Sequence, residues 1–113
     1  MLRMIRGGFM DIKEIQKKVE LFTKEKDLNT TLDVRVMDLV SEVGEMAKEV
    51  LKGTDYGKKS FTPNENWCSE LGDVLFSLIC LANTTETNLE ECINKVLDKY
   101  EKRFATRGTI GSE

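Results

Sequence analysis

The sequence contains no histidine, one proline and three cysteines among 113 residues. Without histidine there is no imidazole base and no histidine-ligated metal site. The same absence disfavours a ferritin-like di-iron bundle, which uses Glu-x-x-His on two helices. The cysteines Cys68, Cys80 and Cys92 are odd in number and widely spaced, which argues against a disulfide framework and a zinc site. We therefore expect reduced cysteines in a cytoplasmic protein. Acid–base chemistry is left to carboxylates, lysines, tyrosines or water activated by a metal ion.

Long apolar runs are also missing, because no stretch approaches the roughly 20 residues that span a membrane. Charged residues make up 33% of the chain and the net charge is -3, which argues against a general nucleic-acid-binding surface. Hydrophobic residues make up 40% and aromatic residues only 7%. This balance is typical of a soluble helical protein with charged outer faces, and we expect neither a membrane nor a nucleic-acid partner.

Apolar residues recur at helical spacing in four segments, and no segment of useful length alternates as a strand does. The segments begin near Asp11, Thr30, Thr62 and Asn88, and they end near Asp27, Gly53, Asn83 and Gly108. The pattern predicts an all-α protein with a four-helix bundle-like protomer. We expect a flexible leader at residues 1–10, a single helical domain at 11–107 and a disordered tail at 108–113.

The third segment has the clearest start signal. Thr62 is predicted as its N-cap, with Pro63 at the first helical position and Glu65 completing a capping box. From Trp67 to Ala82 this segment is apolar around more than half of its circumference, so we expect it to be the most buried helix. Three other helices of this length would leave part of it uncovered, which predicts a homodimer.

Carboxylates form a line along the second segment, beside its apolar face. The line consists of Asp38, Glu42, Glu45 and Glu49. Like charges at this spacing destabilise a helix by a few tenths of a kcal/mol, so a solvated face would more often mix signs. An acidic solvent face is one explanation, and a site that holds a cation is another.

In the third segment, Glu70 and Asp73 hold the same relation to a second apolar stripe. Two such helices face to face would gather carboxylates as ligands for a hard divalent cation such as Mg²⁺. Gly44 and Gly72 lie inside these two motifs and cost about 1 kcal/mol of helix propensity relative to alanine. We expect them to allow close approach of the two helices.

Two stretches carry a family resemblance. Residues 42–45 read Glu-Val-Gly-Glu and residues 70–76 read Glu-Leu-Gly-Asp-Val-Leu-Phe, with 24 residues between Glu45 and Glu70. These two motifs resemble the Glu-x-x-Glu…Glu-x-x-Asp signature of MazG-like nucleotide pyrophosphohydrolases, which belong to the all-α NTP pyrophosphatase superfamily. The resemblance covers roughly residues 11–107. It implies a helical bundle that dimerises or tetramerises and uses Mg²⁺ to split a nucleoside triphosphate into the monophosphate and pyrophosphate.

The resemblance also implies residue roles. The expected ligands of Mg²⁺, for which Mn²⁺ could substitute, are Glu42, Glu45, Glu70 and Asp73. Glu42 is our choice for the carboxylate that orients or deprotonates the attacking water. Asp38 and Glu49 are left as outer acidic residues. Lys99 and Arg103 match basic positions of the family and are expected to bind the triphosphate, although basic residues in the last turns of a helix often only complement its dipole.

Two alternatives stay open on the sequence alone. The first is a non-catalytic helical bundle that binds metal or oligomerises, in which the acidic line is a tolerated solvent face. The second is a relative that acts on phosphoribosyl-ATP. For the physiological role, house-cleaning of non-canonical nucleotides and control of the normal pools are both open.

Overall fold

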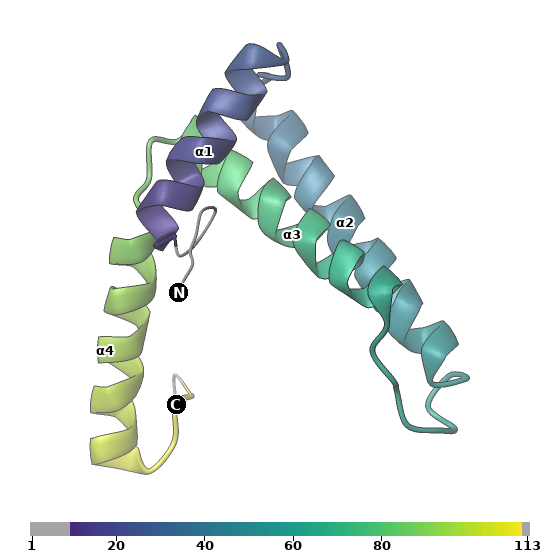
Figure 1. Cartoon of the computed structure of the whole chain (residues 1–113). Helices are drawn as coiled ribbons and strands as arrows, with labels where there is room; N and C mark the ends of the chain where they lie inside the picture. The colour runs from purple at the N-terminus through teal and green to yellow at the C-terminus, as the bar shows by residue number, and fades with distance from the viewer. Residues whose placement is uncertain (1–9, 112–113) are drawn as a thin grey trace, which may run out of the picture. The chain divides into compact units, whose positions relative to one another are not determined.

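The computed structural model describes residues 10–111 and contains no strand among them (Figure 1). Its elements in chain order are α1 (Ile12–Glu25), α2 (Leu32–Gly53), α3 (Glu65–Thr84) and α4 (Leu89–Arg107). The predicted all-α class is confirmed. Within the described part of the chain, no helix is both long and apolar enough to cross a membrane.

The chain divides into two compact units. The central unit is Gln16–Thr87, and the terminal unit combines the segment up to Ile15 with the segment from Asn88 onward. Residues 1–9 of the predicted leader and residues 112–113 of the predicted tail lie outside the described residues. The single domain predicted at 11–107 stays a prediction.

Two predicted helix starts are confirmed by their caps. At α1, the Glu14 backbone N–H donates to Asp11 Oδ1 (2.8 Å), and the Asp11 N–H donates to Glu14 Oε1 (3.1 Å). At α4, Asn88 Oδ1 accepts from the N–H groups of the second and third helical residues at 2.9 and 3.3 Å. Gly108 ends α4 in the left-handed conformation, with φ of 73°, where glycine carries no steric cost.

The predicted start of α3 was wrong by two residues. Asn64, not Thr62, is the N-cap, and its Oδ1 accepts the Trp67 N–H at 3.1 Å. Asparagine caps a helix at least as well as threonine, so the later position competes on equal terms. The later start leaves Pro63 outside the helix. Phe61, which precedes it, packs edge-to-face on Trp67, with ring centroids 5.1 Å apart. Gly53, near which the second segment was predicted to end, is the last residue of α2.

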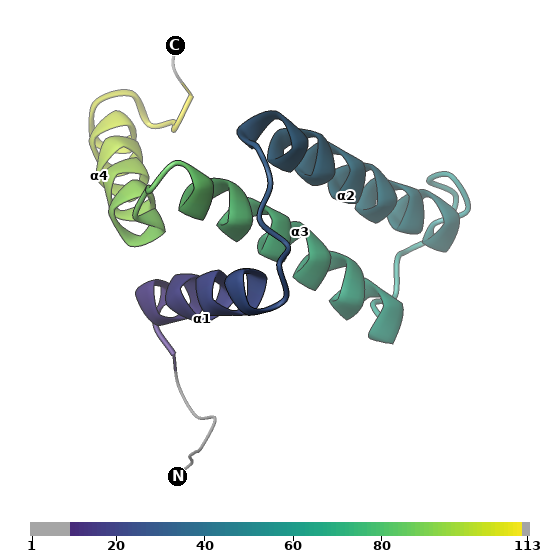
Figure 2. The same cartoon turned by 90° about the horizontal axis from the view of Figure 1, so that it is seen from above.

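In the central unit, α2 and α3 lie side by side, and α3 runs between α1 and α2 (Figure 2). Among residues 10–111, the buried apolar residues lie toward the end of α3 and are Ile79, Cys80 and Ala82. This confirms that α3 is the most buried helix. Gln16 of α1 is hydrogen-bonded to the end of α3 and to the residues that follow it. Its Nε2 donates to Asn83 Oδ1 (3.0 Å) and to the Thr87 carbonyl (2.9 Å).

Candidate metal centre

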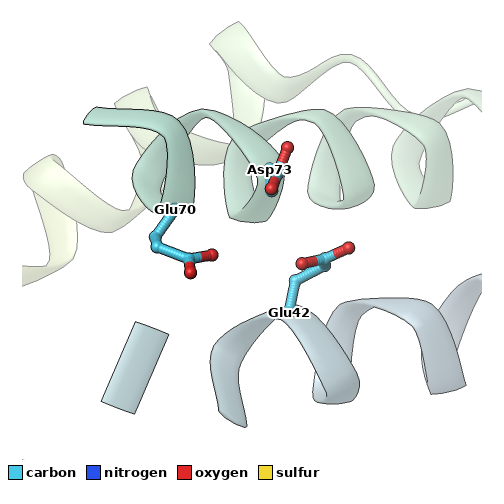
Figure 3. A group of neighbouring side chains, drawn as sticks. All are labelled: Glu42, Glu70 and Asp73. Carbon is cyan, nitrogen blue, oxygen red and sulfur yellow. The ribbon is translucent and has the colours of Figure 1, made fainter. Parts of the chain in front are cut away.

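Three carboxylates from α2 and α3 point toward one another. Figure 3 shows Glu42 on α2 facing Glu70 and Asp73 on α3. One oxygen of each side chain lies within 4.8 Å of the others. Two oxygens that each lie about 2.1–2.5 Å from the same cation can be no more than about 4–5 Å apart. The three carboxylates are therefore close to the spacing of a shared ion, and small side-chain movements would let all three reach it.

Helical periodicity explains how the sequence builds this group. Glu70 and Asp73 are three residues apart, so they lie on one face of α3 and are directed at α2. Glu42 occupies the middle of α2, on the facing side. Glu42 and Glu70 are half-buried and Asp73 is exposed. The group is therefore open to a ligand from solvent while two of its members are partly withdrawn from water.

No basic side chain compensates these charges within the described part of the chain. The ion pairs found there are Lys17–Glu20 and Lys102–Asp98, and neither involves the group. Partial burial raises the pKa of Glu70, and the negative charges of its neighbours raise it further, in the order Glu45, Asp73, Glu49 and Glu42. The group thus concentrates negative charge that a bound cation would relieve.

Glu45 lies beside the group but is not one of the three. Its side chain is exposed, and its oxygens are outside the set that meets within 4.8 Å. The charge of Glu45 nevertheless raises the pKa of Glu70 more than the charge of Asp73 does, so the carboxylates of Glu45 and Glu70 are near each other. Its assignment as a ligand stays a prediction. Glu49 is half-buried and also acts on Glu70, as expected of an outer acidic residue.

The two basic candidates lie on α4, in the terminal unit. Arg103 Nη1 donates to the Ile110 carbonyl at 3.2 Å, and Lys99 Nζ lies 5.3 Å from the centroid of the Tyr100 ring. Neither forms an ion pair with a described residue. Their assignment to the substrate stays a prediction.

The expected role of the motif glycines was wrong for this chain. A Cβ built on Gly44 or Gly72 meets no atom of the described structure within 4 Å. The two helices therefore do not need glycine at these positions in order to approach. The glycine with a close neighbour is Gly53, where a Cβ would lie 2.6 Å from Phe61 Cδ1.

Comparison with known proteins places these residues in a family context. The sequence model described as the MazG nucleotide pyrophosphohydrolase domain matches residues 31–107, which include both carboxylate motifs and the two basic candidates. A curated relative is uncharacterized protein YpjD of Bacillus subtilis (strain 168). It is 34% identical over 106 residues, which cover 90% of this chain and 94% of the relative.

Two solved structures share the fold. One is the crystal structure of the Bacillus-conserved MazG protein, a nucleotide pyrophosphohydrolase, with a TM-score of 0.69 and 32% identity over 81% of this chain and 90% of that one. The other is the crystal structure of YpjD from Bacillus subtilis, with a TM-score of 0.70 and 32% identity over 84% of this chain and 97% of that one. The chain therefore spans nearly the whole of both proteins.

Proposed function

Because this chain belongs to the MazG nucleotide pyrophosphohydrolase family, we propose that it hydrolyses nucleoside triphosphates to the monophosphate and pyrophosphate in a Mg²⁺-dependent reaction. Family membership makes it a hydrolase of pyrophosphate bonds with a nucleotide substrate. The observation that carries the proposal is the convergence of Glu42, Glu70 and Asp73 between α2 and α3. The proposal covers ribo- and deoxyribonucleoside triphosphates, and the substrate panel below includes non-canonical ones.

The donor set fits a hard divalent cation. It consists of carboxylate oxygens alone, which suit Mg²⁺ and Mn²⁺, whereas zinc sites favour imidazole and thiolate ligands. The pKa of Glu70 is raised, and no basic side chain of the described chain pairs with the three carboxylates. Both observations agree with a group that binds a metal cation. Mg²⁺ typically keeps several waters and needs only a few protein carboxylates. Glu45, close to Glu70, is the next candidate ligand.

In the proposed reaction, Glu42, Glu70 and Asp73 hold Mg²⁺, which when bound offsets the charge that develops on the phosphates. Glu42 also orients the attacking water and accepts its proton. The water oxygen bonds to the α-phosphorus while the bond from that phosphorus to the α–β bridging oxygen breaks. Pyrophosphate leaves with the electron pair of that bond. Lys99 and Arg103 supply positive charge to the triphosphate.

The test is pyrophosphate release from canonical and modified nucleoside triphosphates and from phosphoribosyl-ATP, with Mg²⁺, with Mn²⁺ and with EDTA. We expect Glu42→Gln, Glu70→Gln and Asp73→Asn each to lower kcat/KM by about 100-fold or more, the upper end of the losses seen for residues that only support metal ligands. Glu65→Gln, at the exposed start of α3, is the matched control and should keep its activity.

Three outcomes would redirect the assignment. Activity that survives all three ligand variants separately at saturating Mg²⁺ contradicts the site. Binding of Mg²⁺ without pyrophosphate release from any substrate favours the non-catalytic bundle. A strong preference for phosphoribosyl-ATP identifies the second alternative.

We also propose that the protein is a homodimer or a homotetramer. Large apolar side chains of α2 remain exposed, with Met37 at 66% and Val40 at 60%, and Leu75 of α3 is 50% exposed. Apolar surface of this kind is commonly buried against a partner. Light scattering at micromolar concentration should give at least twice the mass of one chain. A monomer would contradict this proposal without affecting the metal site.

A further inference from the structure

A second feature of the central unit has no part in the proposed reaction. It is a cavity of about 520 Å³ between the second half of α1, the start of α2 and the end of α3. Arg35 forms part of its wall on α2, and Cys80 and Asn83 form part on α3. Its volume lies in the range of small-molecule sites, which is about 300–1,000 Å³.

Arg35 is a buried cation that forms no ion pair with a described residue. Its side chain is only 8% exposed, and its Nη2 donates to the Leu28 carbonyl at 2.8 Å. Its Nε is buried and has no hydrogen-bond partner among the described residues. No described carboxylate lies within ion-pair distance of its guanidinium. A buried, unpaired charge is costly to a fold, so a bound group of opposite charge would stabilise it.

The cavity wall does not supply the missing negative charge. Glu20 is the acidic residue of the lining, and it pairs with Lys17 at 3.7 Å. Burial raises the pKa of the Cys80 thiol, so this group is neutral at physiological pH. Lys24 adds a second positive charge without an ion-pair partner in the described chain. The lining therefore carries a net charge of two positive units.

Neutral donors complete the lining. The side chains of Asn29 and Thr30, in the connection from α1 to α2, make no hydrogen bond to a described residue. The amide of Asn29 and the hydroxyl of Thr30 are thus free to donate. A cavity with a buried guanidinium, a nearby ammonium and free neutral donors suits an oxyanion, because an arginine fork can donate two parallel hydrogen bonds to it.

We propose that this cavity binds the phosphate group of a small molecule, as inorganic phosphate or as a phosphate monoester, with Arg35 as its principal ligand. The volume exceeds that of one phosphate and leaves room for the remainder of an ester. Arg35 precedes Glu42 by seven residues of α2, which is about 10 Å along the helix axis. The site is therefore separate from the carboxylate group and does not depend on hydrolysis.

The experiment measures binding to the full chain in EDTA, with inorganic phosphate and adenosine monophosphate as probes and KCl at matched ionic strength. Thermal melts and calorimetric titrations should show saturable binding in the wild type. Arg35→Met should abolish it, and Arg35→Lys, which keeps the charge but loses the fork, should weaken it by about tenfold. Arg107→Met, on exposed α4 outside the cavity, is the matched control and should bind as the wild type does.

Each outcome is informative. A response to phosphate identifies a free oxyanion as sufficient, and a response to the monoester alone shows that the rest of the molecule is also held. The proposal is overturned by equal responses in the wild type and Arg35→Met, or by responses that KCl reproduces. Arg35→Lys serves if Arg35→Met does not fold. Glu42→Gln should leave phosphate binding intact, so this site can fail or succeed independently of the metal centre.

Discussion

A methyl group added at Gly53 tests how the ends of α2 and α3 are joined. The Cβ of Gly53→Ala would lie 2.6 Å from Phe61 Cδ1 and 2.7 Å from Phe61 Cε1. The Phe61 ring cannot give way freely, because it packs edge-to-face on Trp67. Gly44→Ala, in the same helix, is the matched control, since its Cβ meets no described atom within 4 Å.

The two substitutions should have unequal effects on the free energy of unfolding. Alanine in a helix interior stabilises by about 1 kcal/mol relative to glycine, so Gly44→Ala should gain about that amount. Gly53→Ala should gain less helix propensity, because Gly53 is the last residue of the helix. The substitution also displaces the Phe61 ring, which destabilises the fold. Overpacking of this kind costs about 1–3 kcal/mol. We expect Gly53→Ala to be less stable than Gly44→Ala by roughly that cost.

Urea unfolding followed by circular dichroism measures both variants, and a second comparison isolates the cause. Phe61→Ala removes the ring, so Gly53→Ala in that background should no longer destabilise, and the cycle gives the coupling of the two residues. Gly53→Ala as stabilising as Gly44→Ala would refute the reasoning. So would an equal effect of Gly53→Ala with and without the Phe61 ring.

Three further predictions concern the charge of Glu70, the N-cap of α3 and the hydrogen bond between α1 and α3. The pKa of Glu70 is raised in the folded chain. Protonation of Glu70 therefore stabilises the fold fully below the ordinary glutamate pKa, and this stabilisation is lost as pH rises through the raised pKa. Urea unfolding in EDTA at a series of pH values should show this loss in the wild type and not in Glu70→Gln. Asn64→Ala should destabilise by about 0.5–2 kcal/mol in urea melts, whereas Thr62→Ala should stay within about 0.5 kcal/mol, and the reverse order would restore Thr62 as the cap. Gln16→Ala leaves the Asn83 carbonyl oxygen without its partner and should cost about 1–3 kcal/mol, with no change expected in Mg²⁺ affinity by calorimetry.

The helices could be predicted from the sequence because apolar spacing and capping residues agree along most of the chain. The start of α3 could not, because Thr62 and Asn64 are both good caps and local preference hardly separates them. The choice depends on tertiary packing. With the helix beginning after Asn64, Phe61 lies against both Gly53 and Trp67. No pattern within the segment itself contains that contact.

The carboxylate group was predictable for a related reason. A spacing of three residues fixes which face Glu70 and Asp73 share, and the second acidic helix identifies the facing side. The spacing does not fix side-chain torsions, so it could not separate Glu42, which joins the group, from Glu45, which lies beside it. The cost of Gly44 and Gly72 was visible in the sequence, but their surroundings were not.

Arg35 is the residue that changes how α2 is understood. Seven residues at 100° each return to within about 20° of Glu42, so Arg35 continues the acidic line rather than opposing it. It does not neutralise the carboxylates, because it pairs with none of those described and is separated from Glu42 by about a Debye length at physiological salt. One face of α2 thus offers a cation site and an anion site that are nearly independent. Stabilisation by Mg²⁺ and by phosphate should therefore add, since sites without shared partners at this separation rarely couple by more than about 0.5 kcal/mol.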